Sequence, residues 1–181
     1  MKQLKEFTIP FVGLKLGTHE FDFNVDNTFF EHFEYDEFIR SDFEVKLLLT
    51  KKTTLLEMEL TFEGTAHVHC DLTNEPFDQP VSGTYHFVVK FGEEYNDENE
   101  DLLILPHGSY EVNVQQYVYE SIVLALPSRK IHPGVKDGTL QSEILDKLEE
   151  LSPKATPDTD DAPSGETDPR WDDLKKLLTD K

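Results

Sequence analysis

The sequence has little cysteine, few basic residues and no long apolar run, and each shortage excludes a class of protein. Its 181 residues include one cysteine, Cys70, so neither an internal disulfide nor a cysteine-only zinc site can form. No apolar run approaches the roughly 18 residues of a membrane span, and residues 1–6 contain no apolar signal-peptide stretch. We therefore expect a cytoplasmic protein that does not contact a membrane.

The shortage of basic residues gives the chain a large negative charge. Lys and Arg number 17 against 37 Asp and Glu, and the formal net charge is −20. A surface this acidic repels a polyanion unless one patch is locally positive, because nucleic-acid binders gain most of their affinity by neutralising phosphates. The charge argues against a general nucleic-acid binder and favours a protein or a ribonucleoprotein surface as partner.

Signs of catalysis are also missing. The nine glycines are scattered and form no phosphate-binding loop. Carboxylates are too numerous for any two to be assigned as general acid and base, since such a pair needs environments that separate the two pKa values. Cys70 has no positioned base nearby, and a buried, unreactive thiol is the better interpretation. We expect a protein that is not an enzyme and that uses no cofactor and no small-molecule substrate.

Residues 1–112 have the periodicity of β-strands. Apolar and polar residues alternate with a period of two, which places one face of each strand on a core. The runs with this pattern are residues 21–25, 43–49, 56–62, 65–70 and 81–91. Residues 51–53 are a predicted hairpin tip, residues 71–76 a loop, and the acidic stretch 93–101 a solvated loop.

The period changes to a helical one at Asn113. This residue is a predicted N-cap, with Gln116 three positions later and Pro127 as the stop. A second helix is expected to follow Gly138 and to end before Pro153, with an apolar stripe of Leu140, Ile144, Leu145, Leu148 and Leu151. The pattern predicts an α+β fold: a mostly antiparallel β meander or a partly open barrel, with two helices packed on the sheet.

The C-terminal part predicts a tether and a separate short helix. Residues 1–151 form the single expected domain, and residues 152–167, rich in Pro, Ser, Thr and Asp, are a predicted disordered linker. Residues 168–181 predict an amphipathic helix that docks on a partner or folds back on the sheet. Its capping residues and apolar anchors are the candidate partner-docking residues: Asp168, Pro169, Arg170, Trp171, Leu174 and Leu177.

Two histidines suggest a metal site. His67 and His69 are two positions apart on a strand and therefore share a face, which suits two ligands of a metal-dependent β-fold enzyme. The alternative is that both face solvent while their neighbours face the core, namely Ala66, Val68 and Cys70. We favour the solvent-facing alternative, because the sequence specifies no third ligand.

One segment reverses the overall charge. Residues 128–136 contain three bases and no acid, directly after the first helix. The bases either interact with the negative end of that helix dipole or contact RNA. The candidate RNA- or particle-contacting residues are Arg129, Lys130, His132 and Lys136.

Three segments together resemble the YceD family. They are residues 63–76 (EGTAHVHCDLTNEP), residues 119–127 (YESIVLALP) with His132 after them, and the DPRWxxLxxL pattern from Asp168. Many members carry Cys-x-x-Cys where this chain has Cys70 and Thr73, and a second cysteine pair where it has His132. The resemblance therefore does not carry a zinc site over to this chain.

The resemblance implies a function in ribosome biogenesis. It suggests a non-enzymatic cytosolic factor that supports accumulation of large-subunit ribosomal RNA by binding a ribosomal protein or a ribosomal precursor particle. The alternatives are the metal-dependent enzyme that uses His67 and His69 and a generic protein-binding module.

Overall fold

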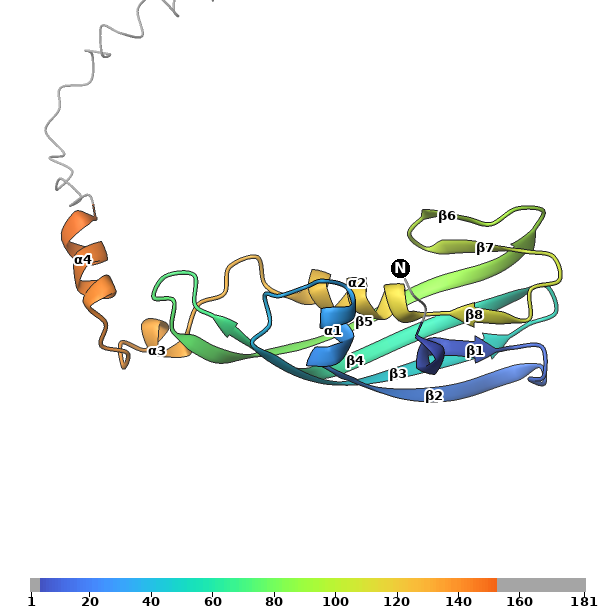
Figure 1. The fold of residues 1–181 in the computed structure, drawn as a ribbon, viewed down its shortest axis with the longest axis horizontal. Coiled ribbons are helices and arrows are strands. Elements are labelled where there is room, and N and C mark those ends of the chain that lie inside the picture. Colours follow the sequence, from blue (N-terminus) through green and yellow to red (C-terminus); the bar gives the residue numbers. More distant parts are fainter. Residues whose placement is uncertain (1–3, 153–181) are drawn as a thin grey trace, which may run out of the picture. The chain divides into compact units, whose positions relative to one another are not determined.

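The structure, a computed structural model, describes residues 4–152 (Figure 1). The chain divides into two compact units, Met1–Leu145 and Asp146–Lys181. The first unit contains all the strands of the described range. The predicted linker beyond Ser152 and the predicted helix 168–181 lie outside the described residues, and with them all six candidate partner-docking residues.

A six-stranded sheet dominates the first unit. Its strands β2 (Gly17–Asp26), β3 (Arg40–Lys51), β4 (Leu55–His69) and β5 (Pro76–Gly92) form an antiparallel meander. β7 (Leu102–Pro106) then pairs with β5 in parallel, and β6 (Asn96–Asn99) lies at the edge beside β7. The sheet does not close, so the partly open barrel is wrong and the predicted meander describes β2–β5.

The alternation in the sequence places one face of this sheet on the core. Along β3, the odd-numbered residues from Ser41 to Leu49 are buried, and the even-numbered residues from Asp42 to Thr50 are exposed or half-buried. The predicted hairpin tip lies between Lys51 and Leu55, as expected. The runs 56–62 and 65–70, predicted as separate, are parts of one strand except for Cys70, and Gly64 between them pairs with Phe43 of β3.

A helix that the sequence pattern did not predict follows β2. α1 (Asn27–His32) interrupts the stretch 1–112 that was predicted as β throughout. Asp26 caps it, since its carboxylate accepts hydrogen bonds from the Thr28 amide at 3.0 Å and hydroxyl at 2.6 Å. The helix buries Phe29 and Phe30, and the ring of Phe30 lies 4.7 Å from that of Phe38.

The acidic stretch 93–101 contains a strand that the sequence pattern did not predict. It was predicted as a loop, but residues Asn96–Asn99 form β6 and pair with β7. The acidic side chains of β6 remain exposed, so only the backbone takes part in the sheet. A short polar edge strand of this kind gives no apolar periodicity, which is why the pattern did not show it.

The predicted first helix is confirmed. α2 (Gln115–Ala125) packs on β5 and buries Val118 and Ile122 (Figure 1). Its N-cap position is Val114, one residue later than predicted, although the Asn113 side chain still accepts a hydrogen bond from the Gln115 amide at 3.0 Å. A small two-stranded sheet of β1 (Thr8–Pro10) and β8 (Glu111–Asn113) precedes it.

The second predicted helix starts later than expected, and none of its residues is buried. α3 (Pro133–Lys136) forms first, and residues 139–142 stay non-helical because the Leu140 amide donates to the Gly134 carbonyl at 2.9 Å. α4 then spans Glu143–Leu151, and none of these residues is buried. Of the two helices predicted to pack on the sheet, α2 does so.

Candidate functional site

The basic segment (residues 128–136) lies against the loop that joins β4 to β5. In this loop, the Cys70 loop (residues 70–75), the Asp71 amide donates to the Lys130 carbonyl at 2.8 Å. The Lys130 amide donates in return to the Asp71 carboxylate at 2.6 Å. Two reciprocal bonds between positions 59 apart in sequence fix the backbone of the basic segment next to the Cys70 loop.

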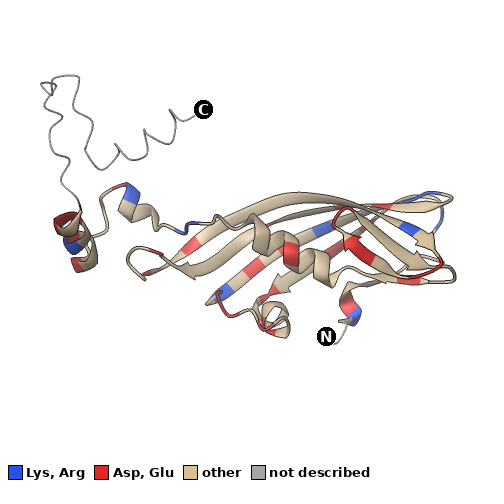
Figure 2. Ribbon diagram, turned by 90° about the horizontal axis from the view of Figure 1, so that it is seen from above, with Lys and Arg blue, Asp and Glu red and all other residues tan. Residues whose placement is uncertain are grey.

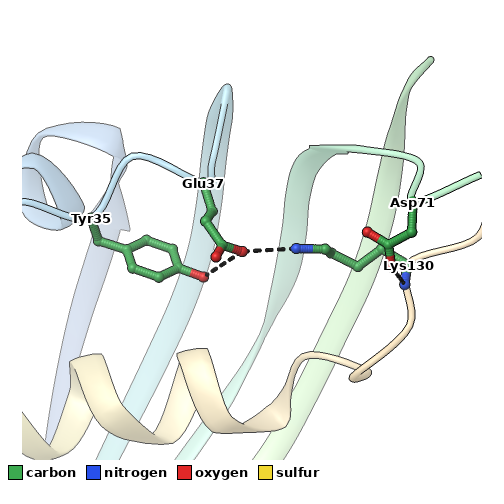
Figure 3. A network of polar contacts seen from close by, with 4 residues as sticks. All are labelled: Tyr35, Glu37, Asp71 and Lys130. Atoms are coloured by element: carbon green, nitrogen blue, oxygen red, sulfur yellow. Dashed lines mark hydrogen bonds and ion pairs between the residues drawn. The ribbon is translucent and has the colours of Figure 1, made fainter. Parts of the chain in front are cut away.

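Lys130 has its charge engaged inside the protein. Its ammonium group donates to the Glu37 carboxylate at 2.8 Å, and the Tyr35 hydroxyl donates to the same oxygen at 3.4 Å (Figure 3). Burial raises the pKa of the Tyr35 hydroxyl, and the negative charge of Glu37 raises it further. Lys130 thus joins the basic segment to the loop before β3 and has its charge neutralised there.

His132 has a structural position as well. Its Nδ1 accepts a hydrogen bond from the Gly134 amide at 2.9 Å and caps α3. Its ring lies edge-on to Phe77 at 5.5 Å, and its backbone amide donates to the Cys70 sulfur at 3.3 Å. The predicted contact residue His132 therefore fixes the start of α3.

Arg129 and Lys136 are the candidate contact residues with unengaged side chains. Both are exposed, and neither side chain has a hydrogen bond or an ion pair within residues 4–152. Of the four predicted contact residues, the two engaged ones hold the segment in place and these two present positive charge to solvent. The contacts of Lys130 and His132 fix the backbone from which both side chains extend.

The Cys70 thiol is the centre of the hydrogen bonds in its loop. Burial raises the pKa of Cys70, but hydrogen bonds from the His132 amide, the Thr73 hydroxyl and the Leu72 and Thr73 amides lower it, and the pKa lies below its ordinary value. Asn74 has a positive φ of 59°, which turns the loop back so that the Cys70 amide reaches the Glu75 carbonyl at 2.9 Å. The loop is thus held by packing and hydrogen bonds.

The residues around Cys70 do not fit a zinc site, which normally takes four nitrogen or sulfur ligands. The Nδ1 atom of His132 already accepts from Gly134, and the buried Thr73 hydroxyl accepts from the Glu75 amide at 3.4 Å. Within residues 4–152, no three or more His, Cys, Asp or Glu side chains are placed to hold a metal ion.

His67 and His69 share the solvent side of β4, as predicted. The alternating neighbours are buried: Ala66, Val68 and Cys70. The His67 Nδ1 atom lies 2.7 Å from the Asp78 carboxylate, and the His69 Nδ1 atom lies 3.0 Å from the Asn74 carbonyl. Each ring has its own partner, and the described residues supply no third ligand to the pair.

Sequence reasoning missed Glu37 and Asp71, which hold the basic segment. Glu37 is 93 residues from Lys130, so only the fold brings the two together. The local sequence contained a weak signal for Asp71, because an acid directly after Cys70 is a candidate partner for any basic segment that packs there. In the described part of the chain, no helix is long and apolar enough to cross a membrane.

The comparisons with known proteins identify a family. The family model described as "Large ribosomal RNA subunit accumulation protein YceD" matches residues 58–178, well over half of the chain. Neither the curated proteins nor the solved structures contained a match. The matched range includes the Cys70 loop, α2 and the basic segment. From this match we conclude that the chain belongs to the YceD family.

Proposed function

We propose that this chain supports the accumulation of large-subunit ribosomal RNA as a non-enzymatic cytoplasmic factor that binds a ribosomal protein or a ribosomal precursor particle. The family match over residues 58–178 carries the proposal. Two features support binding as the mode of action: a positively charged segment that internal contacts hold in place, and the poor fit of both histidine and cysteine positions to a metal centre.

Arg129 and Lys136 supply the contact to the particle. Both charges are exposed and unengaged within the described range, whereas Lys130 and His132 fix the segment. With a net charge of −20, the chain repels RNA over most of its surface, so a phosphate contact has to be small and local. The partner-docking residues around Trp171 also fall inside the matched range and supply a second contact, to a protein.

Salt-dependent sedimentation tests this proposal. The tagged full chain is mixed with ribosomal particles and sedimented through sucrose gradients at several salt concentrations. We expect wild type in the fractions of large-subunit precursors. In the R129A/K136A variant, each lost phosphate contact should remove about 0.7–0.9 from the slope of log affinity against log salt. The W171A/L174A variant should bind less at every salt concentration with an unchanged slope.

The matched control is K46A/K90A, which removes two exposed lysines on the open face of the sheet and changes the net charge equally. Equal slopes for the two double variants would show that Arg129 and Lys136 do not make the phosphate contact. A wild-type chain that stays at the top of the gradient even at low salt would contradict binding itself.

A further inference from the structure

A groove with tyrosine walls lies on the core side of the sheet. It runs between α2 and the strands β5 and β7, with β6 and β8 at its margins, and has a volume of about 830 Å³. Sites for small ligands typically have about 300–1,000 Å³. Buried apolar side chains of the core form its floor, among them Phe62, Leu103 and Val112. We refer to it as the tyrosine groove.

Three tyrosines face this groove: Tyr85, Tyr95 and Tyr117. The Tyr117 ring stacks on Phe87 at 4.1 Å with 13° between the planes, and lies 6.4 Å from the ring of Tyr85. The Tyr85 hydroxyl donates to the Glu100 carbonyl, and the Tyr95 hydroxyl donates to the Asp97 carboxylate at 3.0 Å. The ring contacts join α2 to β5 in an aromatic wall, and the Tyr85 hydroxyl joins this wall to Glu100, just after β6. Tyr95 lies exposed at its margin and bonds within its own segment.

The charge of the groove has one sign. Four carboxylate residues line it: Asp97, Glu100, Glu111 and Glu120. No Lys or Arg is among the described residues that line it, and none of the four acids forms an ion pair within residues 4–152. Burial raises the pKa of Tyr85, and the charges of Asp101, Glu100 and Glu120 raise it further, which indicates a negative potential at the wall.

An aromatic wall and carboxylates without an ion pair within residues 4–152 together select one ligand chemistry, although Asp97 and Glu120 accept hydrogen bonds. A guanidinium or ammonium group stacks on the face of a tyrosine through cation–π attraction and pairs with a carboxylate at its edge. A phosphate or a nucleic acid would be repelled by the same carboxylates. Charge complementarity therefore favours Arg and Lys side chains as the occupants.

We infer that the tyrosine groove binds an arginine- and lysine-bearing segment of a basic protein. The source of the segment, a ribosomal protein, rests on the proposed function; the chemistry of recognition does not. Such a groove would let an acidic chain bind a ribosomal protein directly. A large contact with RNA is then not required. Figure 2 shows acidic but no basic colour on α2, whose residues Gln115–Ala125 include Glu120 and no Lys or Arg.

Fluorescence anisotropy with a defined probe tests the inference. The full chain is titrated into a fluorescein-labelled peptide of four Gly-Arg repeats at physiological ionic strength, which screens diffuse charge. The reference probe has citrulline in place of each arginine and should bind much more weakly. We expect E100Q/E120Q to lower the affinity about tenfold. Y95L should lower it about two- to fivefold, whereas Y95F, which keeps the ring and loses only the hydroxyl bond to Asp97, should lower it less than Y95L does.

The matched control is E20Q/E59Q, which changes the net charge equally at two exposed positions outside the groove. Equal affinity of E100Q/E120Q and E20Q/E59Q would overturn the inference, because the peptide would then sense only the overall charge. Displacement of the labelled peptide by an unlabelled peptide of residues 168–181 would also overturn it by assigning the groove to another occupant. Circular dichroism melting of each variant confirms that the compared proteins are folded.

The two proposals fail separately. If the peptide does not use the groove but the chain still sediments with ribosomal precursors, the groove assignment is wrong and the proposed function stands. If the peptide binds in the groove and the chain never sediments with a particle, the groove binds a basic segment from another source and the proposed function is wrong.

Discussion

Cys70 shows how several hydrogen bonds can converge on one buried thiol. Its sulfur accepts hydrogen bonds from the His132 amide and from residues of its own loop, so the loop and the basic segment meet at a buried thiol. The packing of His132 on Phe77 adds to the hydrogen bonds that hold this loop.

The first prediction concerns metal content. We expect the purified folded protein to contain no stoichiometric zinc, because Thr73 occupies the would-be ligand position and the His132 Nδ1 atom is already used as an acceptor. Metal analysis after dialysis against a weak chelator checks this, together with melting in a strong chelator. One zinc per chain after dialysis, with a lower melting temperature in the strong chelator, would show that the loop binds zinc.

The second prediction concerns Asp26, which caps α1. Its hydrogen bond with the Thr28 hydroxyl lowers the pKa of the carboxyl below its ordinary value of 3.8, against a smaller opposing effect of burial. The lower pKa belongs to the folded state, so the stabilisation is present above pH 3.8 and is lost as the pH falls through the folded-state value. D26A should lower the free energy of unfolding by about 0.5–2 kcal/mol at pH 7.

Urea unfolding at several pH values measures this effect. The stability difference between wild type and D26A should shrink below pH 3.8, and D26N, which keeps an acceptor, should lose less than D26A at pH 7. A difference that is constant from pH 7 down to the acid limit of folding would show that the charge of Asp26 does not contribute.

Residue patterns predicted the location of the basic segment but not which of its side chains have partners within the protein. The charge run identified Arg129, Lys130, His132 and Lys136 equally, because a run of bases carries no record of which side chains have partners. The engaged pair depends on Glu37 and Cys70, whose positions relative to the segment are set by the tertiary fold.

At the scale of elements, sequence patterns predicted the long strands and α2 and missed the short elements. β3, β4 and β5 alternate over enough residues for one face to be identified, and α2 repeats its apolar positions over three turns. α1 has six residues, too few for a helical period, and its adjacent Phe29 and Phe30 resemble a strand core. β6 was missed because its residues have no apolar face, and only its pairing with β7 identifies it as a strand.

The third prediction tests the close contact of β3 with β4. A Cβ at Gly64 would lie 2.2 Å from the Asp42 carbonyl oxygen and 2.7 Å from the Phe43 Cα atom, both backbone atoms of β3. G64A should therefore lower the free energy of unfolding by at least about 2 kcal/mol, measured by urea denaturation. G13A is the control, since a Cβ there meets nothing within 4 Å, and it should change the value by less than about 0.5 kcal/mol. Equal stability of the two variants would contradict this account of the strand pairing.

At the scale of the whole molecule, both proposed contacts depend on the charge distribution. A net charge of −20 repels RNA in general, while a fixed basic segment and an acidic aromatic groove offer two chemically distinct contacts. α2 connects them, because its residues line the groove and its C-terminal end leads into the basic segment. The sequence predicted the basic segment, but the groove requires strands and a helix that are distant in sequence.

The proposed role in the accumulation of large-subunit ribosomal RNA is tested by measuring that RNA. The ratio of large-subunit to small-subunit ribosomal RNA is determined in cells that lack the chain and in cells complemented with wild type, R129A/K136A or the K46A/K90A control. We predict that the ratio falls without the chain, that wild type and the control restore it, and that R129A/K136A restores it less. An unchanged ratio in cells that lack the chain would contradict the account.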